Sequence, residues 1–455
     1  MIPMTLAEIA DVVGGTVDGD ADLEVTGAAY VDNRAPVTGG LFVAIAGERV
    51  DGHDFAAGAH AVLGTRPTGE PTVVVEDAVA ALGQLSRHVA EEVAPIVTAL
   101  TGSQGKTGTK DYLAHILAID GATVATRGNH NNEIGVPLTV LEAARDTRHL
   151  VVEMGARGVG HIGYLCSLAP PGIAAVLNVG TAHLSEFGSR EQIAQAKGEI
   201  VQALPPNGTA VLNADDALVA AMAALTAARV VTFGTQGDVS WREVQLDELG
   251  RPTFELGYAD AWQPVALRQS GAHQVANAAA AAALALAAGL DLVVIAERLS
   301  TAEPGSPWRM EVHHRGDGLV VVNDAYNANP ASMVAAIDAL VAIGVHRNGR
   351  RVAVLGEMLE LGPDVRAAHR EVGRHAAEAG VDLLVVVGEG AAGLAESARA
   401  IPAWQGEAVL TAGRDDALTL VRENVAADDV VLVKASRGAA LEVVADGLLE
   451  RGERR

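Results

Sequence analysis

The chain has 455 residues, of which 49% are hydrophobic and 20% charged, and it carries a formal net charge of -24 with a pI near 4.9. This composition argues against a disordered chain, and the length predicts about three domains of ordinary size. The negative charge disfavours non-specific binding to nucleic acid or anionic membranes, although a local positive site could still bind an anionic small molecule.

Targeting and redox signals point to the cytoplasm. Cys166 is the single cysteine, so an internal disulfide is excluded, as suits a reducing compartment. The N-terminal stretch MIPMTLAEIADVV lacks the basic segment of a secretory signal. The longest apolar run, residues 278–290, is mostly alanine and too short to span a bilayer. We therefore expect a cytoplasmic protein without membrane insertion.

Three regions differ in their residue patterns. Residues 1–95 mix short apolar runs with Gly, Asp and Thr, which predicts a small α+β domain. Residues 96–308 alternate helical stretches with short buried strands, namely PIVTALTG, HLVVEMGA, IAAVLNVG, GTAVLNADD and ARVVTFGT. Such alternation predicts a parallel sheet with helices on its faces. Residues 240–270 look like surface strands and loops, and an alanine-rich helix, QVANAAAAAALALAAG, follows them.

The pattern restarts in residues 309–455. Four strand candidates separated by helices occur there, namely LVVVNDAY, RVAVLGE, DLLVVVGEG and DVVLVKASRG. They predict a second, smaller, Rossmann-like α/β domain. The expected fold is thus α/β with three domains.

The strongest motif is TGSQGKT, at residues 101–107, between the strand PIVTAL and the helix KDYLAHILA. Its glycines let backbone N–H groups close around phosphate oxygens at a helix N-terminus. Lys106 adds a positive charge, and Thr107 can ligate magnesium. Leu100 stands where the general P-loop pattern has its first glycine. A chance glycine-rich turn is the alternative, but the strand–turn–helix context favours a phosphate site.

Two polar residues follow neighbouring strands of the predicted sheet. Glu153 ends the strand HLVVEMGA, where a carboxylate faces the ligand crevice of a parallel sheet and can hold magnesium. His183, in NVGTAHLSEFGS, follows the next strand and is expected at the same edge. An edge-exposed glutamate and a structural or exposed loop histidine are the alternatives, and spacing alone does not decide between them.

Lysine is scarce in this sequence. Of 33 basic residues only four are lysines, at positions 106, 110, 197 and 434. Lys197 lies in AQAKGE, inside a stretch whose apolar residues recur at helical spacing, where a lysine is ordinarily a solvated surface residue. Lysine, unlike arginine, can lose its proton when desolvated and then act as a nucleophile. The motif contexts of Lys106, Lys197 and Lys434 therefore indicate a requirement, against the alternative of drifting minority residues.

Asparagine is concentrated in two segments. Residues 128–137 (GNHNNEIGVP) and 323–330 (NDAYNANP) each hold three, at positions 129, 131, 132, 323, 327 and 329. Both segments could be turn-rich loops. Both also offer paired donors and acceptors that suit a base, a sugar or a peptide.

Taken together, these motifs resemble those of the Mur ligases, ATP-dependent amide-forming enzymes of peptidoglycan synthesis, a process on which cell shape and division depend. DNRAPVTGGLFVAIAGERVDGHDF is similar to the family's N-terminal uridine-nucleotide signature. The central ATPase domain is represented by TGSQGKT, GNHNNEIGVPLTVL, EMGARGVGHIGYL, NVGTAHLSEFGS and AQAKGEI. The remaining matches are GAHQVANAAAA, SPWRMEV, NDAYNANPASM, LGEMLELG and VLVKASRG. GNHNNEIGVPLT and DAYNANP favour the branch that joins D-alanyl-D-alanine to UDP-N-acetylmuramoyl-tripeptide.

The resemblance implies a metal centre and a catalytic set. Lys197 would be carbamylated by carbon dioxide, which converts a cation into an oxygen anion suited to magnesium. Glu153 and His183 would join it around one Mg²⁺, and Thr107 and Glu153 would hold a second beside the phosphates of ATP. The implied catalytic residues are Lys106, Glu153, His183, Lys197 and Arg309.

It also implies ligand contacts. Those to ATP come from the P-loop and the domain junction: Gly102, Ser103, Gln104, Gly105, Lys106, Thr107, Asn277, Arg309, Asp324 and Asn327. Those to the uridylated substrate are Arg34, Asn131, Asn132 and Arg157. Those to the incoming dipeptide are Asn329, Lys434, Ser436 and Arg437. Two positions depart from the family pattern, because Asn33 replaces a common serine and Gln274 a common asparagine, and Gln274 is assigned no role.

The implied reaction has two steps. A peptide carboxylate attacks the γ-phosphoryl group of ATP to give an acyl phosphate, and the amine of D-alanyl-D-alanine then expels phosphate. We expect a monomer whose third domain closes over the site to exclude water. The alternatives are a sister ligase that adds the third peptide residue, a folylpolyglutamate-synthase-like ligase, and a P-loop ATPase switch that makes no amide. Nothing in the sequence favours an inactive, binding-only relative.

Overall fold

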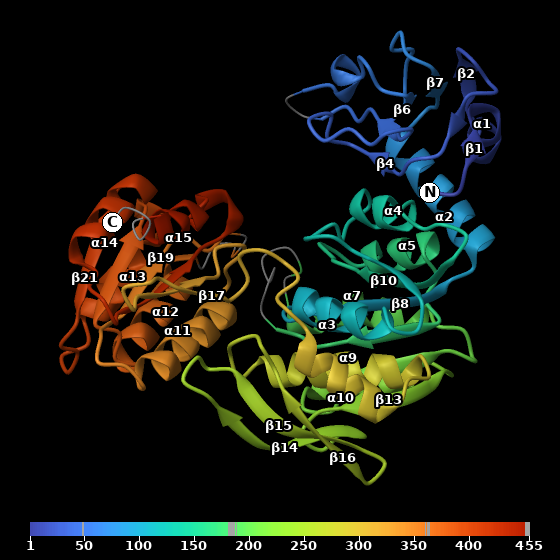
Figure 1. Ribbon diagram of the computed structural model, residues 1–455. Coiled ribbons are helices and arrows are strands. Elements are labelled where there is room, and N and C mark those ends of the chain that lie inside the picture. Colours follow the sequence, from blue (N-terminus) through green and yellow to red (C-terminus); the bar gives the residue numbers. More distant parts are fainter. Residues whose placement is uncertain (48–49, 181–186, 188, 360, 362–364, 451–455) are drawn as a thin grey trace.

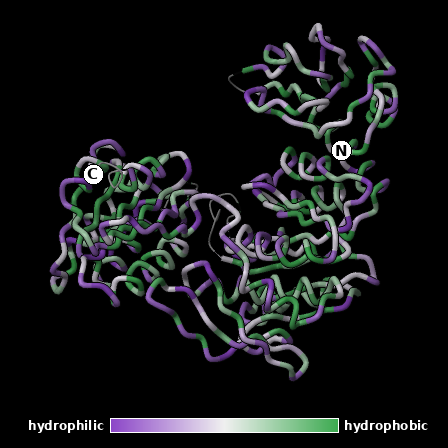
Figure 2. The backbone as a smooth tube through the Cα atoms, in the orientation of Figure 1, coloured by the Kyte–Doolittle hydropathy of each residue, from purple (hydrophilic) through white to green (hydrophobic). Residues whose placement is uncertain are grey.

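The computed structural model describes residues 1–47, 50–180, 187, 189–359, 361 and 365–450. Its strands form four sheets, which belong to three bodies that follow one another along the chain (Figure 1). Figure 2 shows hydrophobic residues gathered inside the bodies and hydrophilic residues along their outer loops. In the described part of the chain, no helix is long and apolar enough to cross a membrane. The α/β fold class predicted from the sequence is confirmed.

The N-terminal body is built on a five-stranded sheet in the order β2-β7-β6-β5-β4, in which β2 is antiparallel to β7 and the other pairs are parallel. A separate antiparallel pair joins β1 to β3. The elements are β1 (Met4–Thr5), α1 (Leu6–Val13), β2 (Thr16–Asp18), β3 (Glu24–Val25), β4 (Ala29–Tyr30), β5 (Leu41–Val43), η1 (Gly52–Phe55), β6 (Ala61–Gly64), β7 (Thr72–Val74) and α2 (Ala78–Val93). Its apolar core extends to Leu138 and Leu141 of the central body.

The central body contains a nine-stranded sheet in the order β16-β15-β14-β13-β12-β11-β8-β10-β9. Neighbouring strands are parallel from β9 to β14, and β15 and β16 continue the sheet as antiparallel strands. The strands are β8 (Ile96–Thr101), β9 (Ala122–Ala125), β10 (Thr147–Glu153), β11 (Ile173–Val176), β12 (Thr209–Asn213), β13 (Arg229–Phe233), β14 (Val239–Leu246), β15 (Pro252–Tyr258) and β16 (Ala261–Ala266).

Helices cover both faces of this sheet because alternate strand residues are buried on opposite sides. Leu100 and Val151 pack with α3, α9 and α10, while Ala99 and Val152 pack with α4, α5 and α7. The alanine-rich run predicted as a helix forms α9, whose small side chains are buried against the sheet. The helices are α3 (Lys106–Leu117), α4 (Gly135–Val140), α5 (His161–Leu168), α7 (Arg190–Gln202), α8 (Ala217–Ala220), η2 (Ala221–Leu225), α9 (Gln274–Ala287) and α10 (Leu292–Thr301).

The C-terminal body repeats this construction around a six-stranded sheet in the order β17-β18-β22-β19-β20-β21. β17 is antiparallel to β18, and the other neighbours are parallel. The strands are β17 (Glu311–His314), β18 (Val320–Asn323), β19 (Arg351–Leu355), β20 (Leu383–Val387), β21 (Glu407–Thr411) and β22 (Val430–Lys434). The helices are α11 (Pro330–Gly344), α12 (Val365–Glu378), η4 (Glu389–Ala391), α13 (Ala392–Arg399), α14 (Arg414–Asn424), η5 (Arg437–Ala439) and α15 (Glu442–Leu449).

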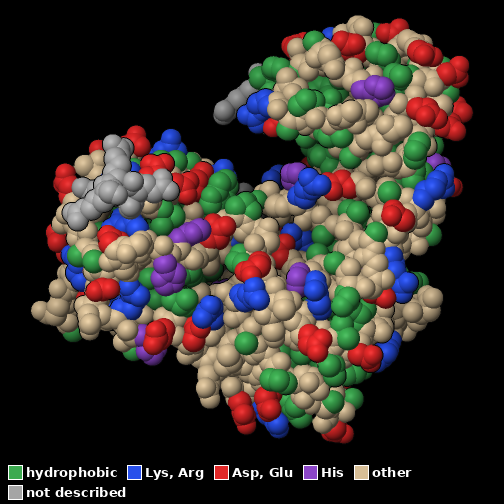
Figure 3. Space-filling model, viewed as in Figure 1, with side chains coloured by type: hydrophobic (Ala, Val, Ile, Leu, Met, Phe, Trp, Pro, Cys, Tyr) green, Lys and Arg blue, Asp and Glu red, His purple; other side chains and the backbone are tan. Residues whose placement is uncertain are grey.

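The two larger sheets direct the carboxyl ends of their parallel strands toward a shared space. In the central sheet, β8 ends at Thr101 and β10 at Glu153, and in the C-terminal sheet β22 ends at Lys434. Residues that follow these ends line one cavity. Figure 3 shows a hollow between the bodies, along which basic, acidic and histidine side chains gather. Ligands of parallel sheets bind at such an edge, so the fold places a candidate site there.

Candidate active site

The cavity between the central and C-terminal bodies has a volume of ≈ 940 Å³. It brings together every site residue predicted from the sequence except Arg34 and His183. The central body contributes the P-loop and Glu153, and the C-terminal body contributes Asp324 and Lys434. His183 lies outside the described residues. Residues far apart in the sequence therefore meet at one site.

The P-loop connects β8 to α3, and helix α3 begins at Lys106. Gly105 has φ +77°, and a Cβ there would lie 2.4 Å from Oδ1 of Asn277, so the position requires glycine. The Lys106 ammonium donates a hydrogen bond to the Gly102 carbonyl oxygen at 2.7 Å. Burial lowers the pKa of Lys106, and the nearby Glu153 carboxylate opposes that shift. The loop thus places a partly buried lysine at the helix N-terminus, where phosphate oxygens bind.

Asn178, which sequence reasoning did not single out, holds the P-loop in place. Its Oδ1 accepts a hydrogen bond from the Gln104 N–H at 3.0 Å, and its Nδ2 donates to the Gln104 carbonyl oxygen at 3.2 Å. The Ser103 hydroxyl accepts a hydrogen bond from the Gly180 N–H at 2.9 Å. Asn178 lies two residues after the end of the buried apolar strand β11, and that position at the sheet edge was the available signal.

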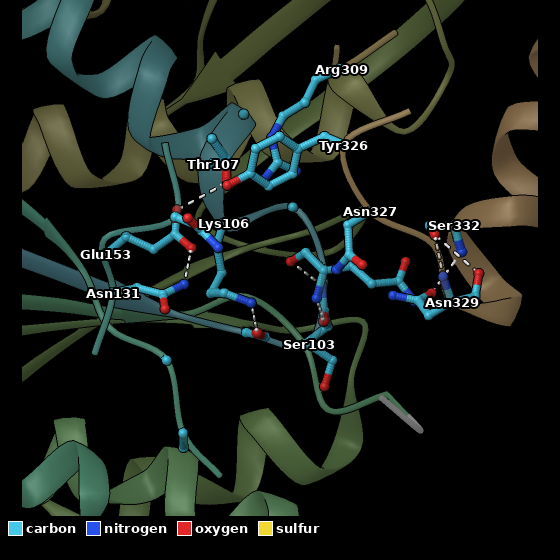
Figure 4. Close-up of a pocket in the computed structure, with 18 of the residues that line it drawn as sticks. Ser103, Lys106, Thr107, Asn131, Glu153, Arg309, Tyr326, Asn327, Asn329 and Ser332 are labelled. Carbon is cyan, nitrogen blue, oxygen red and sulfur yellow. Dashed lines mark hydrogen bonds between the residues drawn. The ribbon is translucent and has the colours of Figure 1, made fainter. Parts of the chain in front are cut away.

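Glu153 is the carboxylate on which the central half of the site converges (Figure 4). Its Oε2 accepts a hydrogen bond from the Thr107 hydroxyl at 3.0 Å, and its Oε1 accepts one from Nδ2 of Asn131 at 2.7 Å. Its own N–H donates to the Thr126 hydroxyl oxygen at 3.0 Å. With only 1% of its surface exposed, Glu153 is a buried anion facing the P-loop helix. The sequence left an exposed edge glutamate open as an alternative, and the structure excludes it.

Lys197 lies on the buried face of α7, beside Ala196 and Ile200, with 6% of its surface exposed. The helix begins after Ser189, whose hydroxyl accepts a hydrogen bond from the Gln192 N–H. Burial, and secondarily the positive charge of Lys106, lower the pKa of Lys197 well below its usual value. Lys197 is therefore not the solvated helix lysine that its periodicity alone suggested.

Glu199, two residues further along α7, connects this helix to the start of α5, just after the loop that carries Arg157. Its carboxylate accepts hydrogen bonds from the N–H groups of Gly160 at 2.5 Å and Gly163 at 2.8 Å, at the N-terminus of α5. A carboxylate at a helix N-terminus is electrostatically favourable. Arg157 precedes this helix and lines the cavity. Two residues of the AKGE segment therefore contribute to the cavity: Lys197 lines it, and Glu199 holds the helix that follows Arg157.

Metal-binding side chains are only partly assembled in the described structure. The described residues contain no group of three or more His, Cys, Asp and Glu side chains that could hold a metal ion. Thr107 and Glu153 nevertheless lie in contact beside the P-loop, as hard oxygen donors suited to Mg²⁺. These two residues fit the metal that the sequence predicts at this position.

Arg309 lies at the junction of the central and C-terminal bodies and faces the cavity (Figure 4). Its guanidinium carbon lies 4.1 Å from the ring centroid of Tyr326, a cation–π contact. Its Nε atom is buried without a hydrogen-bond partner among the described residues. A buried, unpaired guanidinium N–H is a strong donor available to an anion.

Two cavity residues assigned to different ligands pair with each other. The Lys434 ammonium lies 2.6 Å from Oδ2 of Asp324 and donates a second hydrogen bond to the Asn327 carbonyl oxygen at 2.7 Å. The Met310 N–H donates to Oδ1 of Asp324 at 3.2 Å. The resemblance assigned Asp324 to ATP and Lys434 to the dipeptide. In the structure they form one ion pair beside the linker from the central body, with Lys434 buried and Asp324 partly buried.

The other predicted dipeptide residues also make internal contacts. Asn329 caps α11, because its Oδ1 accepts a hydrogen bond from the Ser332 N–H at 2.9 Å (Figure 4). The Ser436 hydroxyl accepts a hydrogen bond from the Leu359 N–H at 2.9 Å. Arg437 forms an ion pair with Glu442 and stacks on Trp308. These side chains line the cavity and at the same time fix its C-terminal wall.

Arg34 lies on the N-terminal body, outside this cavity. Its guanidinium binds both oxygens of Asp32, at 2.8 and 2.7 Å, and 85% of its side chain is exposed. Hydrogen bonds from Arg34 lower the pKa of Asp32 to about 2. The residue is therefore accessible to a ligand only on the N-terminal side of the molecule.

Several cavity residues were not predicted. Tyr326 lies within the segment NDAYNANP, but an aromatic side chain there carried no separate signal. Gln274, which received no role, lines the cavity and orients Asn277, because its Oε1 accepts a hydrogen bond from Nδ2 of that residue at 3.0 Å. His273 and Leu359 also line the wall, and nothing in their sequence contexts marked them.

The fold and the site together define a P-loop protein of the nucleotide-binding α/β class. A glycine-rich turn leads into a helix at the carboxyl edge of a parallel sheet, a strand-end carboxylate contacts the P-loop threonine, and a second α/β body supplies an arginine.

Comparison with known proteins narrows this class. Residues 100–285 match the Mur ligase middle domain, and residues 308–437 match the Mur ligase glutamate ligase domain. The UDP-N-acetylmuramoyl-tripeptide–D-alanyl-D-alanine ligase of Mycobacterium tuberculosis is 46% identical, over 99% of this chain and 98% of that one. The corresponding ligase of Escherichia coli is 36% identical, over 99% of this chain and 100% of that one. The chain belongs to the Mur ligase family.

Solved structures agree with this assignment. MurF from Acinetobacter baumannii superposes with a TM-score of 0.87 at 34% identity, covering 98% of this chain and 99% of that one. MurF from Thermotoga maritima, in complex with ADP, superposes with a TM-score of 0.80 at 30% identity, covering 95% of this chain and 99% of that one.

Proposed function

We propose that this protein joins D-alanyl-D-alanine to UDP-N-acetylmuramoyl-tripeptide in an ATP-dependent reaction that yields ADP and phosphate. Full-length similarity to ligases of that name supports the substrates, and the ADP-bound relative supports the use of ATP. The observation that carries the proposal at the residue level is the convergence of Lys106, Glu153, Lys197 and Arg309 on one cavity.

ATP binds with its phosphates at the P-loop. Backbone N–H groups of residues 102–107 and the Lys106 ammonium contact phosphate oxygens. Arg309, whose buried Nε lacks a partner among the described residues, donates to the transferred phosphoryl group from the opposite side of the cavity. Asn277, Asp324 and Asn327 line the same cavity as the P-loop and are the proposed contacts to the nucleoside.

Lys197 carries carbon dioxide as a carbamate in the active protein. The neutral amine attacks carbon dioxide, an N–C bond forms, and one proton leaves to solvent. The depressed pKa of Lys197 supports this step, because only the unprotonated amine is nucleophilic. The carbamate would also place a negative charge on Lys197, which attracts Lys106, whereas a protonated Lys197 would be repelled by it.

One Mg²⁺ would be held by Glu153, His183 and the Lys197 carbamate, of which His183 lies outside the described residues, and a second by Thr107 and Glu153. The metal supplies positive charge that neutralises the phosphate oxygens. Glu153 is already oriented by Thr107 and Asn131, so its carboxylate requires little rearrangement to serve as a ligand.

The reaction then proceeds in two displacements. An oxygen of the tripeptide carboxylate attacks the γ-phosphorus of ATP, and ADP leaves. The amine of D-alanyl-D-alanine attacks the acyl carbon, a C–N bond forms, the bond to phosphate breaks, and the amine proton passes to solvent. Lys106 and Arg309 offset the repulsion between the two anions of the first step. Residues 96–308 supply the phosphoryl-transfer half of the site.

The outer regions supply the two acceptor sides. Residues 1–95, with Arg34, bind the uridine nucleotide, and Asn131, Asn132 and Arg157 position the peptide that extends from it. Residues 309–455 bring the dipeptide with Asn329, Ser436 and Arg437, and close over the acyl phosphate to exclude water. Lys434 acts there by holding Asp324. The reaction takes place in the cytoplasm.

Phosphate release measured with each substrate omitted in turn tests the proposal. We expect turnover to require ATP, Mg²⁺, the UDP-linked tripeptide and D-alanyl-D-alanine together. Diaminopimelate or lysine offered with the UDP-linked dipeptide is the control for a sister ligase, and a folate with glutamate is the control for a folylpolyglutamate synthase. Turnover with either control set, or ATP hydrolysis independent of every acceptor, would reject the proposed substrates.

A further inference from the structure

Lys110 is the one lysine of the four to which the reaction above gives no task. It lies on α3, one turn beyond Lys106, and only 4% of its surface is exposed. It does not line the cavity. Burying an ammonium group is costly unless it is paired and hydrogen-bonded, so its presence inside the central body needs a cause.

The Lys110 ammonium bridges two neighbouring segments. It donates a hydrogen bond to the Thr126 carbonyl oxygen at 2.8 Å and lies 2.5 Å from Oδ1 of Asp111, which balances its charge. Thr126 is the first residue after β9 and is itself buried. The contact therefore fixes the distance between the P-loop helix and the end of the adjacent strand.

Thr126 in turn contacts Glu153, the carboxylate of the proposed active site. Its hydroxyl oxygen accepts the N–H of Glu153, and its own N–H donates to the Val151 carbonyl oxygen at 3.0 Å. The chain that follows Thr126 leads within five residues to Asn131, whose Nδ2 holds the other side of Glu153. Glu153 is thus held by the two ends of a segment whose start is tied to Lys110.

We propose that Lys110 is a positioning residue that sets Glu153 and the asparagine loop, residues 127–132, against the P-loop. Lys110 lies on α3, the helix that also carries Lys106 and Thr107. Its bond to Thr126 therefore sets the distance between those two residues and Glu153. The inference rests on the proposed function for its substrates, and on the geometry alone for the contact between Lys110 and Thr126.

Lys110→Met tests the inference, because it keeps the aliphatic stem and removes the donor. We expect the KM for the UDP-linked tripeptide and the Mg²⁺ concentration for half-activity to rise about tenfold, the typical effect of losing a hydrogen bond to a charged group. The KM for D-alanyl-D-alanine should stay within about twofold, because that substrate binds on the other body. Asp111→Asn, which leaves the bond to Thr126 intact but removes the counter-charge of Lys110, is the matched control: it should lower the stability of the protein and leave both the KM for the UDP-linked tripeptide and the Mg²⁺ requirement within about twofold of wild type.

Two readouts work without turnover. Calorimetry of ADP binding with and without Mg²⁺ should show a smaller metal-dependent gain in affinity for Lys110→Met than for wild type. Hydrogen exchange should accelerate in residues 126–133 and at Glu153, with the C-terminal sheet unchanged. If Lys110→Met folds poorly, Thr126→Val removes the hydroxyl that accepts the Glu153 N–H and that donates to the Val151 carbonyl oxygen at 3.5 Å, and it should give the same pattern.

Equal rises in the KM of all three substrates, or hydrogen exchange accelerated throughout the central body, would show that Lys110 serves stability alone and would overturn the inference. A wild-type protein that makes no product rejects the proposed function. ADP calorimetry and hydrogen exchange then still decide the role of Lys110.

Discussion

The central and C-terminal bodies each bury a lysine at the shared cavity, but the two lysines are treated in opposite ways. Lys434 lies 2.6 Å from Asp324, so its charge is balanced within the C-terminal body. Lys197 has no such partner charge among the described residues: burial, and secondarily the positive charge of Lys106, lower its pKa. A balanced buried charge is compatible with a positioning role. A charge buried beside a like charge is unfavourable for folding and indicates a chemical role instead.

Strand register explains the paired lysine. β18 and β22 are parallel neighbours in which Asn323 lies opposite Val433. Asp324 and Lys434 each come one residue later, so the register brings them to the same level of the sheet edge. Lys197 comes from a helix, and α7 directs it toward the P-loop, where the neighbouring charge is positive. The difference between the lysines therefore follows from the elements that carry them.

Substitution of Lys197 should have the largest effect on activity, and it is the most direct test of the contrast with Lys434. We expect Lys197→Ala to reduce kcat at least about 10³-fold, because it deletes the proposed oxygen anion from the phosphoryl-transfer centre. Added acetate or formate should restore part of the activity of Lys197→Ala, and should leave wild type unchanged. Phosphate release under bicarbonate titration is the measurement.

Lys197→Arg is the matched control for charge, since arginine remains cationic and forms no carbamate under these conditions. It should be as inactive as Lys197→Ala and should gain nothing from acetate. A fully active Lys197→Arg would show that the site needs a cation at this position, and the contrast with Lys434 would disappear.

Breaking the C-terminal pair should instead act on stability. Lys434→Met leaves the partly buried Asp324 carboxylate without its ion-pair partner and should destabilise the protein by about 2 kcal/mol. Asp324→Asn in the same chain should recover much of that loss, because no charge is then left unpaired. Scanning calorimetry gives the shift in Tm, and Arg374→Met, which breaks an exposed pair with Glu378, is the control with little expected change. An additive double variant would mean that the two residues do not act as a pair.

Substitution of Arg309 tests whether the C-terminal side of the cavity also contributes a positive charge to phosphoryl transfer, as Lys106 does from the central body. Arg309→Met should lower kcat/KM for ATP about 10²-fold, because it removes a donor aimed at the transferred phosphoryl group. Tyr326→Phe keeps the ring beneath the guanidinium and should stay within a few-fold of wild type. Steady-state kinetics at saturating acceptors measure both. A loss in Tyr326→Phe as large as that in Arg309→Met would assign the effect to packing of the junction.

Much of the architecture could be predicted from local sequence. Each buried apolar run named as a strand forms one, because parallel strands covered on both faces leave a continuous apolar signal. The strand β21, by contrast, went unpredicted. Glu407 and Leu410 on this edge strand are exposed, so its sequence lacks the apolar run that marks a central strand.

The site could be predicted only as far as its motifs reach. The P-loop, Glu153 and Lys197 were found because the chemistry of each is tied to its own segment. The pairing of Asp324 with Lys434 depends on the register of two strands separated by 110 residues, which local sequence does not contain. Lys110 was overlooked for a related reason, since its partner is a backbone carbonyl and leaves no trace in residue type.

The smallest expected effect concerns His369 and the pH dependence of stability. It tests whether the C-terminal body also provides hydrogen-bond partners for a buried neutral side chain. Its Nε2 accepts the N–H of Met358 at 3.0 Å and its Nδ1 contacts the Val365 carbonyl oxygen at 2.8 Å, so the ring is neutral and carries its proton on Nδ1. Burial lowers the pKa of His369. The unfolded chain therefore takes up this proton first as the pH falls. The contribution to stability is complete above the unfolded pKa of about 6.5 and declines below it, by at most about 1.4 kcal/mol per pH unit.

His369→Gln retains a donor and an acceptor and removes the titration. Its free energy of unfolding should therefore vary less between pH 8 and pH 5.5 than that of wild type. His375→Gln, on the same helix and paired with Asp338 at the surface, should keep the wild-type pH dependence. Because Met358 precedes Leu359, whose N–H binds the Ser436 hydroxyl, protonation of His369 should also loosen the dipeptide side of the cavity. The KM for D-alanyl-D-alanine should then rise at low pH in wild type more than in His369→Gln, whereas identical profiles in the two proteins would mean that this wall does not depend on the imidazole.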